Sequence, residues 1–406
     1  MRERLYSSMV MHPNDSNRAL GLTSSIKGVP TKRPSVFASC FGRGKEAALP
    51  GLQVIAHTSI ADNATTSIPL HNILWIEKTS DAIEVDYVVK GSKGRLQPRK
   101  DRFPVTGEAS TLKTLDTWIS SVLAKAYGRS TPRKRAYVLV NPFSGTKKAR
   151  SQWQGSIKQI FQAARWDLTV VHTESSGHAI ELVRDLDINS YDVVMACSGD
   201  GVVHEIFNGL AKRADARRAF AQLPIAHVPC GTGNSLSKAL YGVREPTIAA
   251  LEIIKGIGIP FDVASITQRG DDGGVVRTVS FDGLAFGLVG EIEPSTEHLR
   301  WMGELRYRYG YVKKVLMKQA YPCDIAFKVE AHGRQEVTEL YARERSLAEQ
   351  PNWSGITEDS TSVNELGLPP LKWGTIEDDI PGEWESVKWD NMGMLWTGSV
   401  SVFLRS

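Results

Sequence analysis

The stretch SGDGVVHEIFNGL, residues 198–210, places two glycines around Asp200 and then continues with the spacing of an amphipathic helix. The apolar side chains that recur every three or four residues are Val203, Ile206, Phe207 and Leu210. Such a spacing predicts one buried helix face. The short apolar run before it, residues 191–197, is typical of a buried strand. We therefore predict a strand, a tight glycine turn and a helix that begins near Asp200.

The same pattern occurs twice more. Residues 136–145 (AYVLVNPFSG) and 223–234 (LPIAHVPCGTGN) each end an apolar run in a glycine-bearing turn. Strands that alternate with helices predict a parallel sheet with right-handed crossovers. In such a sheet ligands bind beyond the carboxyl ends of the strands, where all three turns would lie. Glycine permits close backbone approach and helix N-termini attract phosphate oxygens, so a nucleotide is the expected ligand.

Two common nucleotide-binding classes are disfavoured. The chain has no GxxxxGK[ST] pattern, which P-loop nucleotidases require, and GTGN does not have the spacing of the GxGxxG fingerprint of nicotinamide-binding domains. The net charge of +4 from 49 basic and 45 acidic residues is nearly balanced, unlike that of a nucleic-acid-binding protein. A phosphate-rich small ligand or an anionic membrane surface is compatible with it.

Composition indicates an ordinary intracellular protein. With 406 residues and 41% hydrophobic residues, the chain can form two domains with real cores. The four cysteines are scattered without a CxxC pair, which favours a reducing compartment. The N-terminus has no apolar stretch of signal-peptide length, and no run approaches the roughly 20 apolar residues of a membrane span. A cytoplasmic protein, soluble or peripherally associated with membranes, is therefore expected.

Changes in composition predict four zones. Residues 1–50 are polar and rich in Ser, Pro and basic side chains, and are expected to be disordered. Residues 51–130 combine short strands and one helix in an accessory module, and residues 131–260 hold the α/β nucleotide-binding unit. Residues 261–406 are expected to form a β-rich domain, interrupted by an acidic insert over 347–370.

Asp200 admits two interpretations. An aspartate near a helix start can cap the helix that follows it, because its oxygens accept amide hydrogen bonds. Alternatively, a carboxylate beside bound phosphates can act as a general base on an attacking hydroxyl during phosphoryl transfer. Sequence alone leaves both open.

Several motifs resemble a known family. VNPFSGTKKA, TESSGHAIEL, SGDGVVHEIFNGL and PCGTGNSLSKAL resemble, in order and spacing, the diacylglycerol-kinase-like lipid kinase catalytic domain. FDGLAFGLVGEIEPSTEHLRWMGELRYRYG resembles the sphingosine (sphingoid long-chain base) kinases, and LPPLKWGTIEDDIPGEWESV their fungal members. The resemblance spans about residues 137–398. It implies a three-layer α/β domain resembling phosphofructokinase, a β-sandwich-like domain that holds the lipid, and ATP with Mg²⁺ in the cleft between them.

The resemblance also implies roles for individual residues. Asp200 would be catalytic, and no metal ligand is assigned. The nucleotide would be bound by Asn141, Ser144, Gly145, Thr146, Thr173, Ser198, Gly199, Gly201, Gly231, Thr232, Gly233, Asn234, Arg300 and Arg306. The lipid would be bound by Glu293, facing the cationic head group, and along its alkyl chain by Leu284, Phe286, Leu288 and Val289. The plainer alternatives are a solvated helix face for the arginines, a surface acid for Glu293 and ordinary core for the apolar residues.

Three departures from the family pattern affect the prediction. Thr146 stands where the family has a lysine, and Gly283 replaces a small polar residue. The chain ends at GSVSVFLRS, where the family continues, so the β-rich domain is expected to be incomplete and to leave Phe286 and Leu288 accessible. The main hypothesis is an ATP-dependent kinase of sphingoid bases that contacts membranes and no nucleic acid. The alternatives are a truncated, non-catalytic member that only binds nucleotide or lipid, and, disfavoured by WMGELRYRYG, a diacylglycerol kinase.

Overall fold

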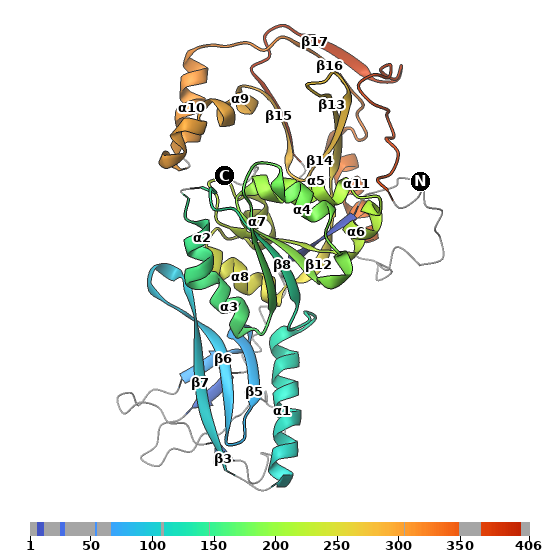
Figure 1. Ribbon diagram of the computed structural model, residues 1–406. Helices are drawn as coiled ribbons and strands as arrows, with labels where there is room; N and C mark the ends of the chain where they lie inside the picture. Colours follow the sequence, from blue (N-terminus) through green and yellow to red (C-terminus); the bar gives the residue numbers. More distant parts are fainter. Residues whose placement is uncertain are drawn as a thin grey trace.

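The computed structural model describes residues 6–11, 25–28, 53–54, 66–106, 109–145, 147–303, 305–348 and 367–398. Three parts follow one another in Figure 1: a small antiparallel sheet with a long helix, a central α/β unit, and a third part of hairpins and helices. The predicted α/β fold followed by a sheet-rich part is confirmed. Within the described residues no helix is both long and apolar enough to cross a membrane.

The central sheet has the strand order β12-β1-β11-β10-β8-β9. Its strands are β1 (Tyr6–Met11), β8 (Arg135–Val140), β9 (Asp167–His172), β10 (Val193–Ser198), β11 (Ile225–Pro229) and β12 (Ile257–Asp262). All neighbours run parallel except β12, which pairs antiparallel with β1. The carboxyl ends of β8, β10 and β11 therefore meet at one edge, where the three glycine turns begin.

Two helical layers cover the sheet because successive strand side chains point to opposite faces. Val138 and Val140 of β8 pack into one cluster, and Tyr137 and Leu139 into the other. The first cluster is covered by α2 (Ala149–Gln152), a π-helical turn (Trp153–Ile157), α3 (Lys158–Ala163) and α8 (Pro246–Lys255). The second is covered by α4 (His178–Arg184), α5 (Asp200–Ala211), α6 (Ala216–Gln222) and α7 (Ser235–Tyr241).

An N-terminal segment lies inside the central sheet, where disorder was expected. Strand β1 pairs with six residues of β12 and, through Met9, with Ile225 of β11. YSSMVM carries no charged side chain, but the sequence around it is polar. The mean composition of residues 1–50 therefore gives no sign of a strand. Strand β2 (Ser25–Gly28) likewise pairs with β4 (Thr66–Pro69). The remainder of the expected disordered zone lies outside the described residues.

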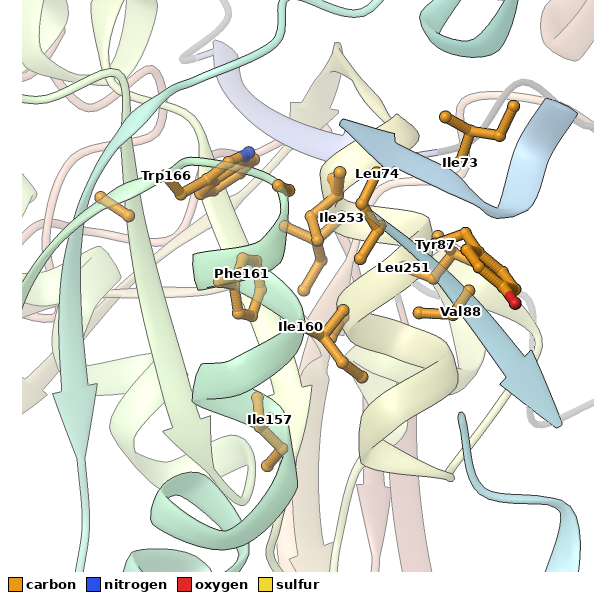
Figure 2. Packing of buried hydrophobic residues seen from close by; sticks show 14 of the residues in the cluster. Ile73, Leu74, Tyr87, Val88, Ile157, Ile160, Phe161, Trp166, Leu251 and Ile253 are labelled. Carbon is orange, nitrogen blue, oxygen red and sulfur yellow. The ribbon is translucent and has the colours of Figure 1, made fainter. Parts of the chain in front are cut away.

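The first part of the molecule shares a core with the α/β unit. Its sheet contains β3 (Gln53–Val54), β5 (Ile73–Lys78), β6 (Ala82–Lys90) and β7 (Leu96–Thr106), next to α1 (Ala109–Tyr127). Figure 2 shows Ile73, Leu74 and Val88 packing toward α3 and α8. The ammonium of Lys255 on α8 donates to the Ile73 carbonyl and lies 3.8 Å from the ring centroid of Tyr127. Burial lowers the pKa of Lys255 to about 7. The limits of the separate domains stay predictions.

The described strands of the third part pair as three separate two-stranded sheets. These sheets are β13 (Ala264–Arg269) with β14 (Val275–Ser280), β15 (Gly283–Gly287) with β18 (Met394–Gly398), and β16 (Cys323–Phe327) with β17 (Glu385–Trp389). Its helical elements are α9 (Leu288–Ser295), a 3-10 segment η5 (Glu297–Met302), α10 (Leu305–Leu316) and α11 (Gly333–Ala348). Most of the predicted acidic insert, 349–366, lies outside the described residues.

Exposure in this part agrees only partly with the sequence-based expectation. Phe286 is 40% exposed, whereas Leu288 is only 8% exposed. The expectation that Leu288 is accessible is therefore wrong. The reason is that Leu288 begins α9, which packs against both β15 and β18, and its amide donates to the Gly393 carbonyl.

Candidate active site

The three glycine turns meet backbone against backbone. The Gly199 amide donates to Ser144 Oγ at 2.8 Å. A Cβ atom at Gly231 would lie 2.2 Å from the Gly199 Cα, and one at Gly199 would lie 3.0 Å from the Gly233 carbonyl oxygen. No side chain fits between chains this close, so glycine is required at this junction.

The first loop is held by local contacts. Gly145 has a φ of +55°, in the left-handed region, and a Cβ there would lie 3.0 Å from the Cys230 carbonyl oxygen. Asn141 Oδ1 accepts the Phe143 amide at 2.9 Å. Thr173, buried at the end of β9, donates its amide to the Val140 carbonyl at 3.0 Å. Thr146 lies outside the described residues.

The third loop closes on itself through Asn234. Its Oδ1 accepts the Gly231 amide at 3.1 Å, and its Nδ2 donates to the Gly231 carbonyl at 2.8 Å. Thr232, between them, is half-buried. The side chain of Asn234 therefore fixes the loop that contacts Gly199.

Asp200 caps a helix, but not the one that the sequence suggests. It is the first residue of α5, yet its Oδ2 accepts the Ser235 amide at 2.9 Å and its Oδ1 accepts the Leu236 amide at 3.2 Å. Both donors belong to the first turn of α7. Its side chain remains 24% exposed. The contacts hold the carboxylate in one orientation beside the glycine junction and leave part of its surface open.

A buried histidine lies behind Asp200. His227 of β11 is fully buried, its Nε2 lies 3.0 Å from the Ser198 carbonyl oxygen, and its Nδ1 lies 3.8 Å from Asp200 Oδ1. Burial lowers the pKa of His227, which favours the neutral ring with the proton on Nε2. Sequence reasoning missed it because a single histidine in the apolar run LPIAHVP carries no signal of its own.

A second carboxylate reaches the same place from the third part of the chain. Asp282 lies between β14 and β15, and its Oδ2 accepts the Ser235 hydroxyl at 2.8 Å. Ser235 thus contacts both Asp200 and Asp282. Burial raises the pKa of Asp282, and the nearby Asp200 carboxylate raises it further. Only the FDG turn after β14 could have suggested it from sequence.

The helix that begins at Asp200 also holds the third part in place. Asn208 of α5 donates to the Val279 carbonyl and accepts the Val279 amide, both at 2.9 Å. The ring of Phe207, the residue before Asn208, stacks on that of Phe281 at 5.3 Å between centroids. The side chain of Asn208 thus makes the two backbone hydrogen bonds that a neighbouring strand would make with Val279. These bonds hold β14 against α5 and so fix the position of Asp282, which follows β14.

The predicted arginine and glutamate form one cluster on α9 and α10. Arg306 is 2% exposed and donates to Glu293 at 3.1 Å, to Glu297 at 3.2 Å and to the Tyr307 hydroxyl at 2.9 Å. The Glu293 side chain remains 67% exposed. Arg300 lies in η5. The structure therefore brings Arg306 to the predicted lipid residue Glu293.

The predicted alkyl-chain residues differ in their exposure. Leu284 and Phe286 of β15 are exposed, while Leu288 is buried and Val289 half-buried at the start of α9. The ring of Phe286 meets that of Tyr321 edge-on at 6.3 Å. Within the part of the chain that the structure describes, no three His, Cys, Asp or Glu side chains gather as a metal site.

Two family models and several curated proteins match parts of this chain. Residues 135–266 match the family Diacylglycerol kinase catalytic domain, and residues 32–128 match a Domain of unknown function (DUF7493). Sphingoid long chain base kinase 5 of Saccharomyces cerevisiae is 33% identical over 59% of this chain and 34% of its own length. Sphingoid long chain base kinase 4 of Schizosaccharomyces pombe is 31% identical over 76% of this chain and 63% of its own.

Plant and bacterial proteins match as well. Sphingosine kinase 1 of Arabidopsis thaliana is 34% identical over 63% of this chain and 52% of its own. The chain thus spans between about a third and two thirds of the length of these curated relatives. A solved structure described as a diacylglycerol kinase of Bacillus anthracis is 23% identical, with a TM-score of 0.38, over 50% of this chain and 63% of its own.

Proposed function

Because residues 135–266 match a diacylglycerol kinase catalytic domain in a chain related to sphingoid long chain base kinases, we propose that the protein is an ATP-dependent lipid kinase. It transfers the γ-phosphoryl group of ATP to the primary hydroxyl of a sphingoid base and produces the 1-phosphate. The observation that carries this proposal is the oriented, partly open carboxylate of Asp200 at the junction of three glycine loops.

The glycine loops bind the phosphates of ATP. Their backbone approaches a ligand closely because glycine has no side chain, and two of the loops lead into helix N-termini, where anions are favoured. Phosphoryl transfer needs mainly positioning and charge, which such loops supply. Contacts such as that of Ser144 with Gly199 hold the loops rigidly before the nucleotide arrives.

Asp200 acts as the general base. As the substrate oxygen bonds to the γ-phosphorus and the bond to the ADP oxygen breaks, the proton of the hydroxyl passes to the carboxylate. The two α7 amides occupy one side of the carboxylate and fix its direction. The neutral ring of His227 excludes water behind it.

The residues present also fit Mg²⁺. Hard oxygen ligands suit this ion, which is commonly held by one or two carboxylates together with substrate phosphates. Asp200 and Asp282 both contact Ser235, and the Asp200 carboxylate disfavours the charged form of Asp282. A divalent cation relieves that repulsion, so Asp282 is the proposed ligand. When bound, the ion neutralises charge on the β- and γ-phosphates.

The lipid is held by the third part of the chain. The exposed carboxylate of Glu293 can accept a hydrogen bond from the ammonium of the base, although Arg306 already contacts one of its oxygens. Exposed Leu284 and Phe286 offer apolar surface to the alkyl chain. Diacylglycerol lacks the cation and is therefore a poor substrate.

The test is an assay of the purified chain with labelled ATP and either sphinganine or diacylglycerol. Sphinganine should be the better acceptor, and Glu293→Gln should raise its KM by roughly tenfold, because a charge-assisted hydrogen bond contributes about 1.5 to 3 kcal/mol. The KM for ATP should stay nearly constant. The matched control is Glu297→Gln, which removes the other carboxylate partner of Arg306. Preference for diacylglycerol, or binding of ATP without transfer to either lipid, would refute the proposal in favour of the alternatives.

We further propose that the surface of η5 and α10 contacts anionic membranes. Large apolar side chains are exposed there, with Trp301 and Leu316 each 76% exposed and Val312 55% exposed. Lys313 of α10 is exposed among them, and Lys318, two residues after the end of α10, is exposed as well. Apolar side chains mixed with basic ones are typical of helices that lie in the membrane interface.

Sedimentation with phosphatidylserine-containing vesicles tests this surface. Leu316→Asp should lower the partition coefficient at least tenfold, because it places a charge where apolar surface enters the interface. Val337→Asp on α11, at a site 53% exposed, is the matched control and should bind normally. Equal losses of vesicle binding in both variants would show that η5 and α10 do not form the membrane-binding surface.

A further inference from the structure

Two cysteine thiols lie in contact at the base of the glycine loops. The Sγ atoms of Cys197 and Cys230 are 3.3 Å apart, and the residues are 0% and 8% exposed. We propose that this pair is a reversible oxidation site, at which a Cys197–Cys230 disulfide switches off the proposed kinase. The effect on activity rests on the proposed function, whereas formation of the bond does not.

The sheet register places both thiols on the same face. Cys197 of β10 pairs with Val228 of β11, and Cys230 follows two residues after Val228. The Cys230 amide donates to the Ser198 carbonyl at 2.8 Å, which keeps the two chains paired at this level. A disulfide has an S–S length of about 2.05 Å. The sulfurs must therefore approach by roughly 1.2 Å from their present 3.3 Å.

Peroxide is the chemical class of oxidant that suits this site. Burial and the hydrogen bond with Cys230 raise the pKa of Cys197, so the more accessible Cys230 reacts first. Its thiolate attacks hydrogen peroxide, forms a sulfenic acid and releases hydroxide, which takes up a proton to give water. The Cys197 thiol then attacks the sulfenic sulfur, and a second water leaves. Two thiols and one peroxide thus give one disulfide and two waters, and a dithiol reductant reverses the reaction.

The loops above the thiols have no room to absorb the movement. Cys230 leads directly into Gly231, where a Cβ would already lie 2.2 Å from the Gly199 Cα. Cys197 is followed by Ser198 and Gly199, next to Asp200. Drawing the sulfurs together therefore presses one loop against the other beside the base. We expect the oxidised protein to transfer phosphate at least tenfold more slowly.

The experiment uses the full chain with Cys40→Ser and Cys323→Ser, so that only the pair remains. After treatment with hydrogen peroxide, trypsin should release residues 185–212 and 219–238 as one linked species, two hydrogens lighter than the sum of both peptides. Dithiothreitol should separate them and restore activity. The control adds Cys230→Ala, which removes the bond and should leave activity unaffected by peroxide concentrations that oxidise the pair.

Three outcomes would overturn the proposal. These are a sulfinic acid at Cys230 without cross-link, no oxidation at all, or a complete cross-link with unchanged transfer rate and unchanged hydrogen exchange in residues 199–201 and 231–233. A reduced protein that transfers no phosphate to any lipid would refute the proposed function instead. In that case the linked peptides and the exchange rates still decide whether the disulfide forms and disturbs the loops.

Discussion

Gly231→Ala should abolish phosphoryl transfer and destabilise the α/β unit. The added Cβ would lie 2.2 Å from the Gly199 Cα and 2.6 Å from its nitrogen, and both atoms belong to backbone that cannot rotate away. Overpacking of this kind costs about 1 to 3 kcal/mol or more in the free energy of unfolding. The loops must separate, which displaces Asp200, so turnover should fall by a factor of about 100 or more, since misplacement by about 1 Å costs that much. Urea denaturation and the kinase assay measure the two effects.

Gly155→Ala is the matched control for this change. Gly155 lies in the π-helical turn, and a Cβ there has no atom within 4 Å. We expect its stability and turnover to stay close to those of the unmodified protein. If Gly231→Ala behaves like Gly155→Ala in both measurements, the close contact between the loops is not what positions the site.

The glycine loops show how far the sequence predicts the fold. Apolar runs that end in glycine turns were enough to predict a parallel sheet and the edge where Ser144, Gly199 and Gly231 lie. The spacing of apolar residues indicates whether a segment is a helix or a strand and which of its faces is buried, because both depend on residues close together in the sequence. The contact of Gly199 with Gly231 depends on strand order, which no local pattern encodes.

Long-range polar contacts could not be predicted for the same reason. Because capping is normally local, the sequence predicts that Asp200 caps its own helix. Its carboxylate oxygens instead accept amide hydrogen bonds from α7, which begins 35 residues further along the chain. Asn208 lies on the polar side of a helical pattern, but its amide replaces a strand partner for Val279. Strand β1 was missed because the short segment YSSMVM is surrounded by polar sequence, and its partner in the sheet, β12, lies about 250 residues further along the chain.

Asp200→Asn should lower turnover by a factor of about 100 or more, which is the usual contribution of a general base. The amide has nearly the same shape, but it cannot accept the proton of the lipid hydroxyl. ATP affinity should change much less, because the loops that bind the phosphates keep their glycine contacts. Steady-state kinetics with sphinganine, together with ATP titration by calorimetry, separates the two quantities.

The same substitution also weakens a helix cap, and this effect must be separated from chemistry. Asparagine keeps one carbonyl oxygen for the α7 amides, while its NH₂ group faces the other amide, so one of the hydrogen bonds to Ser235 or Leu236 is lost. Loss of a cap costs about 0.5 to 2 kcal/mol. A fall in stability of that size is therefore expected together with the fall in rate.

Glu245→Ala supplies the comparison. Glu245 caps α8 with a single oxygen, Oε2, which accepts the amides of Thr247 at 2.8 Å and Ile248 at 3.0 Å, so only removal of the side chain breaks the cap. Its loss should cost a similar free energy of unfolding and leave turnover nearly unchanged, because α8 covers the other face of the sheet. If both variants are destabilised to a similar extent but only the Asp200 variant loses turnover, the chemical role belongs to Asp200. If both variants keep a normal rate, the carboxylate is a cap and the base lies elsewhere.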